Sequence, residues 1–309
     1  MTEFVHIPVL YDEVIEGLNI KPDGIYVDGT LGGGGHSAGI AGMLTTGRLI
    51  ANDLDTEAIE AAGQKLGSLA EKVTFIHDDY KNIEKHLDEL NIDKVDGILL
   101  DLGVSSYQID TAERGFSYTK DAPLDMRMDR SGGITAGDVV NTYPERELVR
   151  IFTEYGEERF ARKIASDIVK ARAKKPIETT LELASLIAEG YPLGFKLGHP
   201  AKRVFQALRI EVNGELNGLY QAVEGMARRL KAGGRMCVIT FHSLEDRIIK
   251  TCFKNLEASC VCDKNMPVCT CGKVSEIKIL TKKPIEASKE ELIRNKRAES
   301  AKLRIIEKK

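Results

Sequence analysis

The sequence predicts an α/β protein built on a doubly wound parallel sheet, with an all-helical subdomain inserted into it. Short apolar runs alternate with helical patterns over the first third of the chain, and this rhythm stops near Ser106 and resumes after Leu208. Alternating strands and helices are typical of parallel sheets that bind ligands at the carboxyl ends of their strands. With 309 residues, the chain is long enough for one large domain or two.

The first four strands are predicted from short apolar runs that each end in acids or glycines. These runs cover 24–30, 47–55, 72–80 and 94–103. Between them, apolar residues recur at helical spacing and predict helices over 36–44, 56–70 and 81–92. Strand, helix and strand in this order place all four carboxyl ends at one edge of the sheet.

The middle of the chain carries helical patterns and no comparable strand run. Helices are predicted over 144–175 and 179–191, and a longer helical pattern over 201–234 is weakened by Gly214, Gly218 and Gly225. A fifth strand, a helix and two terminal strands are predicted over 233–243, 244–256, 276–281 and 301–308. We therefore expect a sheet domain of residues 1–106 and 206–309, and an inserted helical domain of residues 107–205.

Composition limits the class of protein. The apolar content of 42% fits a soluble globule, no run of about 18 apolar residues is present, and the N-terminus lacks the pattern of a secretory signal. We expect a cytoplasmic protein without a membrane span. The net charge of −3 gives no general attraction for nucleic acid, so any basic surface has to be local.

Four consecutive glycines stand in VDGTLGGGGHS, Val27 to Ser37, between a predicted strand and a predicted helix. Bare backbone at such a junction lets a ligand approach closely, beside the amide groups of the helix. The stretch from Gly33 fits G-x-G-x-x-A, a pattern that a plain tight turn also produces. A P-loop is disfavoured, because no Lys-Ser or Lys-Thr pair follows.

An acid stands at or near the end of each of these four strands. Asp28 comes just before the glycines, Asp53 ends the second strand, 77–80 contains two acids beside His77 and Tyr80, and Asp101 ends the fourth strand. The position of Asp53 suits the hydroxyl groups of a ribose. The set of acids suits the cationic amine and sulfonium of S-adenosylmethionine better than the pyrophosphate of a dinucleotide. Surface acids that merely cap strands are the alternative.

Six motifs in chain order carry a resemblance to a known family. They are VDGTLGGGGHS, GILLDLGVSS, ERGFSY with PLDMRMD, YGEERFARKIA, HPAKRVFQALRIEVNGEL and FHSLEDR, and the resemblance runs from about His6 to Arg304. Together they resemble the bacterial RsmH (MraW) family. Its members are S-adenosylmethionine-dependent methyltransferases that modify the exocyclic amino nitrogen of a cytidine in the decoding region of 16S ribosomal RNA.

The resemblance implies a Rossmann-like class I methyltransferase sheet with an inserted helical domain that recognises the substrate. It implies 16S ribosomal RNA or the small ribosomal subunit as partner, and it leaves a homodimer open. Two departures flank the site loop, since Tyr107 and Ala122 stand where Pro and Gly are expected, and NKRAES replaces NPRARS at 295–300. The cofactor contacts that it implies come from Gly34, Gly35, His36, Asp53, Tyr80, Asp101 and Gln108.

Methylation of an exocyclic amino group needs an in-line approach and an acceptor for the charge that develops on nitrogen. Asp101 is the best placed acceptor by topology, and His242, at the end of the fifth strand, is a candidate base or base-orienting residue. Phe241 is a candidate stacking surface for the base. The alternative for His242 is a purely structural role.

The segment RGFSYTKDAPLDMRMD, residues 114–129, alternates aromatic, Met, Arg and Asp residues in a polar frame. Such a segment can hold a base that has left its stack, which methylation of a stacked base requires. Asp125 and Arg127 are favoured for such a function. For Phe116 and Met126, packing of the insertion onto the sheet is an equal alternative.

A local basic surface is predicted on the helical stretch 159–175, which has seven Lys or Arg residues against the single Asp167. Phe160, Ile164 and Ile168 form the opposite, apolar stripe. The basic face could follow the phosphates of an RNA. A solvated charged face is the alternative.

The cysteine segment CVCDKNMPVCTC contains four of the six cysteines, and the other two, Cys237 and Cys252, are predicted to be core residues. Four thiolates on a short hairpin can form a tetrahedral, structural zinc site. Redox-active thiols and idle surface cysteines are the alternatives. The candidate zinc ligands are Cys260, Cys262, Cys269 and Cys271.

Two other functions use the same features. An NAD-linked dehydrogenase would use the same glycines, and preference for NADH over S-adenosylmethionine would identify it. A non-catalytic ribosome-assembly factor would keep the fold and bind the cofactor without transferring its methyl group.

Overall fold

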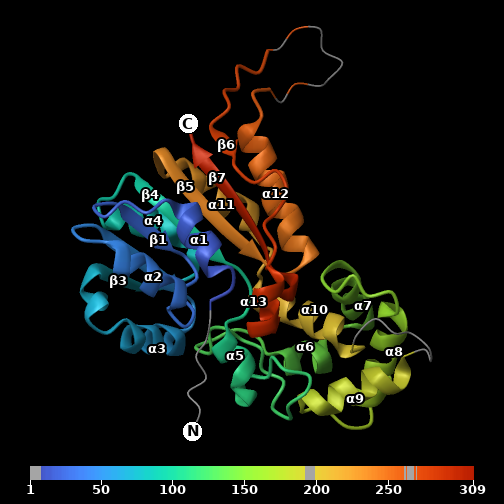
Figure 1. Cartoon of the computed structure of the whole chain (residues 1–309). Coiled ribbons are helices and arrows are strands. Elements are labelled where there is room, and N and C mark those ends of the chain that lie inside the picture. The colour runs from blue at the N-terminus through green and yellow to red at the C-terminus, as the bar shows by residue number, and fades with distance from the viewer. Residues whose placement is uncertain (1–7, 192–198, 261, 263–267, 269) are drawn as a thin grey trace. The chain divides into compact units, whose positions relative to one another are not determined.

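The computed structural model describes residues 8–191, 199–260, 262, 268 and 270–309. The chain divides into two compact units, one formed by residues 1–103 and 218–309 and the other by residues 104–217 (Figure 1). We refer to them as the sheet unit and the inserted unit. None of the helices in the described residues combines the length and the apolar character needed to span a membrane.

The sheet unit contains a seven-stranded sheet in the order β3-β2-β1-β4-β5-β7-β6. The first five strands are parallel, and β7 runs antiparallel to both β5 and β6. This confirms the predicted fold class, a Rossmann-like sheet of the class I methyltransferase type. The strands are β1 (Ile25–Asp28), β2 (Arg48–Asp53), β3 (Val73–His77), β4 (Val95–Asp101), β5 (Leu230–Thr240), β6 (Ile277–Ile279) and β7 (Lys302–Lys308).

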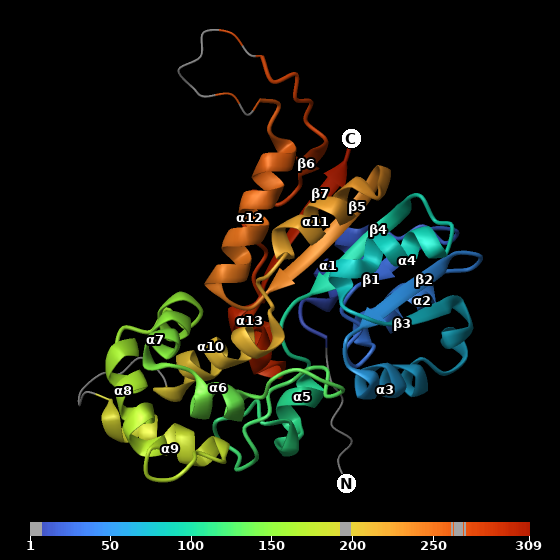
Figure 2. The same cartoon turned by 180° about the vertical axis from the view of Figure 1, so that it is seen from behind.

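Helices cover both faces of this sheet (Figures 1 and 2). One core cluster joins buried residues of α1, α2 and α3 to the sheet, among them Leu18, Ile40 and Leu99. On the other face lie α4, α11 and α12 (Figure 2). The helices are α1 (Tyr11–Leu18), α2 (Gly35–Met43), α3 (Thr56–Leu66), α4 (Ile83–Glu89), α11 (Leu219–Arg228), α12 (Ser243–Glu257) and α13 (Lys289–Arg294).

The described part of the inserted unit contains helices and one isolated bridge, between Pro123 and Thr179. Its own hydrophobic core gathers buried residues such as Ile151, Ile164 and Leu183. The apolar stripe predicted for the basic helix therefore faces this core. The helices are α5 (Ser106–Asp110), α6 (Ala136–Thr142), α7 (Glu145–Glu154), α8 (Ala161–Arg172), α9 (Thr180–Gly190) and α10 (Ala201–Asn213).

Two predicted helices are each divided in the structure. The stretch 144–175 breaks between α7 and α8, where Glu157 has a φ of 47° and a Cβ on Gly156 would lie 2.7 Å from the carbonyl oxygen of Phe152. The stretch 201–234 breaks at Gly214 and Gly218, whose φ values of 57° and 71° end α10 and cap α11.

The inserted unit also ends later than the predicted residue 205. That residue, Phe205, lies within α10, and this helix buries Val204, Ala207 and Leu208 in the core of the inserted unit. A helix whose apolar face belongs to one core cannot be shared between two domains. The chain returns to the sheet unit at Gly218, a glycine with positive φ, just as it leaves that unit at Gly103, whose φ is 96°.

Candidate functional site

The glycine turn after β1 is fixed by hydrogen bonds and by left-handed backbone. Gly32 and Gly34 have φ values of 48° and 70°, which side chains rarely allow. The amide of Gly34 donates to the carbonyl of Leu31 at 2.8 Å, and the amide of Gly32 donates to Oδ2 of Asp53 at 2.7 Å. The turn is therefore tied to the carboxyl end of β2.

The glycines of this turn differ in the space around them. A Cβ on Gly34 would lie 2.9 Å from the Cβ of Ala62, and one on Gly35 would collide with the ring of Pro8. A Cβ on Gly33 would meet nothing within 4 Å. Packing therefore explains the absence of side chains at Gly34 and Gly35, whereas Gly33 leaves bare backbone beside open space that a ligand can use.

Asp28, at the end of β1, is a buried carboxyl group. Its Oδ2 accepts a hydrogen bond from the hydroxyl of Ser37 at 2.7 Å, and its Oδ1 accepts one from the amide of Thr30 at 3.1 Å. Burial raises the pKa of Asp28 to about 6, and the nearby Asp53 acts in the same direction. Among the described residues, no cationic side chain pairs with Asp28.

Asp53, at the end of β2, bridges two backbone segments. Its Oδ2 holds Gly32, and its Oδ1 accepts a hydrogen bond from the amide of Asp55 at 2.9 Å. Burial raises the pKa of Asp53 to about 6, against the effect of these bonds. Since a carboxylate has about four acceptor sites, both oxygens can still accept hydrogen bonds from hydroxyl groups.

Asp101, at the end of β4, is the most strongly perturbed acid of this edge. Burial, together with the charges of Asp28 and Glu245, raises the pKa of Asp101 to about 8. Its Oδ2 lies 3.7 Å from Nε2 of His36. Its buried Oδ1 accepts no hydrogen bond from any described residue. A buried acceptor of this kind favours a ligand that brings a donor or a positive charge.

Sequence reasoning missed three residues that support these groups. The hydroxyl of Thr30 accepts a hydrogen bond from the amide of Asp101 at 2.5 Å, Ser37 donates to Asp28, and Tyr11 stacks on His36 with ring centroids 6.0 Å apart. Thr30 and Ser37 stand within the quoted glycine stretch, so their position was a usable signal. Tyr11 follows no predicted strand and gave none.

His242 caps the start of α12 together with Glu245. The Nδ1 of His242 accepts from the amide of Glu245 at 3.4 Å, and its Nε2 lies 3.1 Å from Oε1 of Glu245. In return, Oε2 of Glu245 accepts from the amide of Phe241 at 3.0 Å. These contacts give His242 a structural role, and its catalytic role stays a prediction.

The remaining predicted cofactor residues lie in both units. Tyr80 starts the short 3₁₀ helix Tyr80–Asn82 directly after β3, and its Cβ lies 3.2 Å from the position that a Cβ on Gly29 would take. Gln108 lies in the inserted unit, buried in α5, where its side chain accepts from the amide of Ser105 at 3.0 Å and completes a capping box. Both assignments stay predictions.

The segment 114–129 is held rigidly within the inserted unit. Arg127 donates to both carboxylate oxygens of Asp125, at 2.7 and 3.0 Å, and this pairing holds the pKa of Asp125 below its ordinary value despite partial burial. The buried guanidinium of Arg114 donates to the carbonyls of Arg127 and Met128 at 3.0 and 2.9 Å. Met126 is buried in the helical core, and Phe116 packs against that core.

The basic stretch 159–175 is less free than its composition indicates. Arg172 donates to the carbonyls of Val140 and Tyr143, both at 2.6 Å. Lys163 pairs with Asp167 at 2.7 Å, and Lys175 pairs with Glu182 at 3.0 Å. Arg172 thus has a structural role in joining α8 to α6. The exposed cations for which no such pairing is found in the described residues are Arg162, Lys170 and Lys174.

A family model matches almost the whole chain. The model of the MraW methylase family matches residues 3–309. The chain belongs to the MraW methylase family. This confirms the family that the six motifs indicated.

Two relatives match this chain along almost their whole length. Proteins named ribosomal RNA small subunit methyltransferase H are 58% identical in Clostridium botulinum (strain Loch Maree) and 56% identical in Lachnospira eligens, each over 99% of this chain and 99% and 98% of the relative. A solved rRNA methylase from Streptococcus thermophilus is 13% identical, with a TM-score of 0.41, over 96% of this chain and 93% of that one.

Proposed function

We propose that this protein transfers a methyl group from S-adenosylmethionine to the exocyclic amino nitrogen of a cytidine in the decoding region of 16S ribosomal RNA. The observation that carries this proposal is the grouping of Asp28, Asp53 and Asp101 beside the Gly32–Gly35 turn, at the carboxyl edge of the sheet of a methylase family member. The ribosomal substrate is supported by the names of its relatives.

The residues present fit S-adenosylmethionine. The bare backbone at Gly33 offers a close approach, and the amides at the start of α2 face the same turn. Asp53 would bind the ribose hydroxyls, and Asp28 would attract the amino group of the methionine part. Both acids have raised pKa values, which a cationic partner would lower again.

When bound, S-adenosylmethionine supplies the methyl group as an electrophile. The amino nitrogen of cytosine is a poor nucleophile, because its lone pair is delocalised into the ring. Asp101 would accept a hydrogen bond from that amino group through its unused Oδ1 and stabilise the positive charge that develops on nitrogen. His242 would act through Glu245, whose charge already influences the pKa of Asp101.

The inserted unit would recognise the RNA. Its exposed cations Arg162, Lys170 and Lys174 lie on or directly after α8, opposite the apolar stripe that the core buries. Cations on one helix face can follow a phosphate backbone. The substrate is either free 16S RNA or the small subunit, and the reaction takes place in the cytoplasm.

Nucleoside mass spectrometry of small-subunit RNA tests the proposal. Cells that lack the gene should lose one N4-methylated cytidine, and the wild-type gene should restore it, whereas a gene with Asp101→Ala should not. An unchanged nucleoside profile would reject the methyltransferase assignment. In vitro, retained cofactor binding without transfer to RNA would indicate an assembly factor, and preference for NADH would indicate a dehydrogenase.

A further inference from the structure

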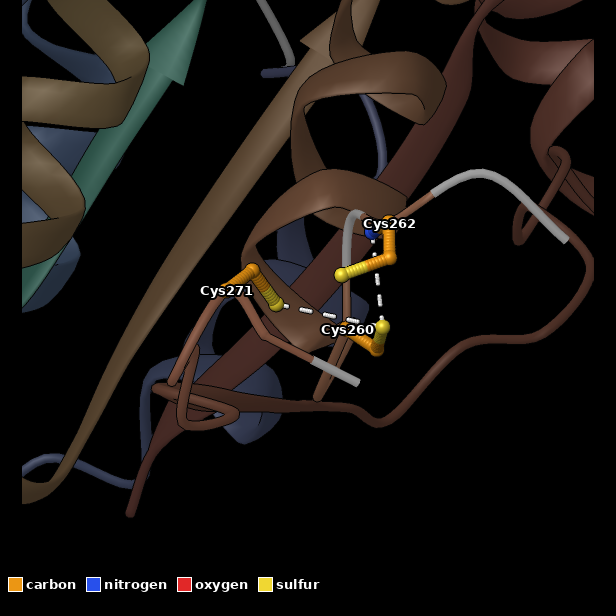
Figure 3. A group of neighbouring side chains, drawn as sticks. All are labelled: Cys260, Cys262 and Cys271. Atoms are coloured by element: carbon orange, nitrogen blue, oxygen red, sulfur yellow. Dashed lines mark hydrogen bonds between the residues drawn. The ribbon is translucent and has the colours of Figure 1, made fainter. Parts of the chain in front are cut away.

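The cysteine segment lies far along the chain from the glycine turn, between the end of α12 and β6 in the sheet unit (Figure 1). Cys260, Cys262 and Cys271 belong to its described residues, and their thiol groups point toward one another (Figure 3). All three sulfur atoms lie within 4.8 Å of one another. Cys269, the fourth cysteine of the predicted set, lies outside the described residues.

The distance between two of these sulfur atoms matches that of two thiolate ligands on a single metal ion. The Sγ atoms of Cys260 and Cys271 are 3.8 Å apart. A zinc–sulfur bond of about 2.3 Å places two thiolates about 3.8 Å apart on a tetrahedron. A disulfide would require about 2.05 Å, and in a four-iron cluster each thiolate binds a different iron.

The backbone supplies a hydrogen-bond donor to one of these sulfur atoms. The amide of Cys262 donates to Sγ of Cys260 at 3.4 Å. Donors directed at sulfur are the outer contacts that stabilise metal-bound thiolates.

The other two cysteines of the chain provide a contrast. Cys237 and Cys252 are buried singly in the sheet unit. Burial raises the pKa of both thiols, to about 12 for Cys252. They are therefore ordinary core residues, as predicted, and they serve as internal controls for the exposed group.

The described residues of the cysteine segment include no buried apolar side chain. Its described residues from Ala258 to Glu276 form no helix or strand, and Val268 and Val274 are 68% and 76% exposed. Connections of this length without secondary structure are uncommon in compact domains. A metal that joins Cys260 and Cys262 to Cys271 would close the segment across its base, where the amide of Glu276 already donates to the carbonyl of Leu256 at 3.1 Å.

We propose that Cys260, Cys262 and Cys271 bind one zinc ion, which orders the connection between α12 and β6. We assign the site a structural role, because it lies on the connection between α12 and β6, outside the acid-lined edge of the sheet. Thiolate ligands select zinc over harder divalent ions such as magnesium. This inference does not depend on the proposed methyl transfer.

Metal analysis of the full-length protein, purified under reducing conditions without an affinity tag that binds metal, tests this site. We expect about one zinc per chain by inductively coupled plasma mass spectrometry. Cys260→Ser and Cys271→Ser should each lower the zinc content at least tenfold, whereas the control Cys252→Ala should keep it. Iron in place of zinc, a Cys260–Cys271 disulfide in the reduced preparation, or zinc that persists in both serine variants would overturn the assignment.

Limited proteolysis gives a second measurement that is independent of activity. Removal of zinc by a chelator should speed cleavage within 258–276, at Lys273 for example, by tenfold or more, and added zinc should reverse this. Cleavage at an equal rate with and without zinc would show that no metal orders the segment. A variant that folds poorly would be cleaved faster throughout the chain. The wild-type protein treated with chelator carries no substitution, so its cleavage reports the loss of metal alone.

Discussion

Gly33 is a position where the fold tolerates a side chain but the proposed cofactor does not. Because a Cβ at Gly33 meets nothing within 4 Å, Gly33→Ala should change the free energy of unfolding by less than about 0.5 kcal/mol. The added methyl group would occupy space that the cofactor needs, so its affinity should fall at least tenfold, about 1.4 kcal/mol. Isothermal titration calorimetry with S-adenosylmethionine, beside thermal unfolding, measures both effects.

Gly34→Ala is the matched variant. Its backbone φ of 70° and its approach of 2.9 Å to Ala62 should cost about 1–3 kcal/mol of stability. The two alanine variants should therefore differ in what they damage. If Gly33→Ala binds the cofactor as the wild type does, the glycine turn does not contact it.

Asp101 should reduce the stability of the ligand-free protein. Its pKa is about 8 in the folded state and about 3.9 in an unfolded chain, so the folded state binds its proton more tightly. The resulting stabilisation is complete below about pH 4 and is lost as the pH rises toward 8. Asp101→Asn removes this loss and should raise the free energy of unfolding at pH 8 by about 1–3 kcal/mol.

The same substitution should lower methyl transfer by roughly 100-fold, because a neutral amide stabilises developing positive charge poorly. Thermal unfolding at pH 5 and pH 8 measures the stability gain, which should be larger at pH 8. A variant that is less stable than the wild type at both pH values would contradict the buried, unpaired state of this carboxyl group.

Binding of a cationic cofactor should release protons from the site. Asp28 and Asp53 have pKa values of about 6, and Asp101 of about 8, and a positive charge lowers all three. The affinity for S-adenosylmethionine should therefore increase from pH 6 to pH 8. Calorimetry in buffers with different heats of ionisation counts the protons released. Proton uptake, or affinity that falls over this range, would show that the cation lies elsewhere.

At the scale of elements, one helix of the inserted unit supports the segment 114–129. Asn213, the last residue of α10, donates to the carbonyl of Met126 at 2.8 Å and accepts from the amide of Met128 at 2.8 Å. Asn213→Ala leaves both backbone groups without this partner, at a cost of about 1–3 kcal/mol. Hydrogen exchange in 114–129 should increase, whereas Lys202→Ala, on an exposed position of α10, should leave it unchanged.

The strands were readable from the sequence as short apolar runs, the first four of which end in acids or glycines. Each of the seven strands overlaps its predicted range, but β5 begins at Leu230, inside the stretch 201–234 that was predicted as helical. The break between α7 and α8 was not readable, because Glu157 takes a left-handed backbone conformation that its residue type does not favour. The break between α10 and α11 was signalled by Gly214 and Gly218. α1 also had no counterpart among the predicted elements.

The residues of the site also divide into those that the sequence predicted and those that it did not. The acids at the strand ends were found by position alone, since the carboxyl edge of a parallel sheet is a fixed place. The stacking of Tyr11 on His36 joins segments that only the folded chain brings together. Met126 is a similar case, because its backbone is left-handed and held by two hydrogen bonds. Its carbonyl accepts from the side chain of Asn213, and its amide donates to the carbonyl of Arg114.

At the scale of the whole molecule, the two units have separate cores and carry functional side chains of different charge. We propose that the acids of the sheet unit bind the cationic cofactor and that Arg162, Lys170 and Lys174 of the inserted unit bind RNA. The chain crosses between them at Gly103 and Gly218, two glycines with positive φ. RNA binding and cofactor binding should therefore be separable by substitution.

Charge reversal of Arg162, Lys170 and Lys174 to Glu tests this separation. RNA affinity should fall. In a plot of log affinity against log salt concentration, the slope should become shallower by about 0.7–0.9 for each phosphate that the variant no longer neutralises. Affinity for S-adenosylmethionine should stay unchanged. Filter binding of 16S RNA between 50 and 200 mM salt, the range over which phosphate binding of this kind is strongly salt-dependent, measures the slope.

Two controls separate this effect from others. Lys282, Lys283 and Lys289, exposed in the sheet unit, give a variant of equal net charge when all three are changed to Glu, and its salt slope should match the wild type. Arg172→Ala should lower stability instead, because its guanidinium holds two carbonyls of the α6 region. If both charge-reversal variants change the slope equally, RNA responds to net charge and the face of α8 is not its docking surface.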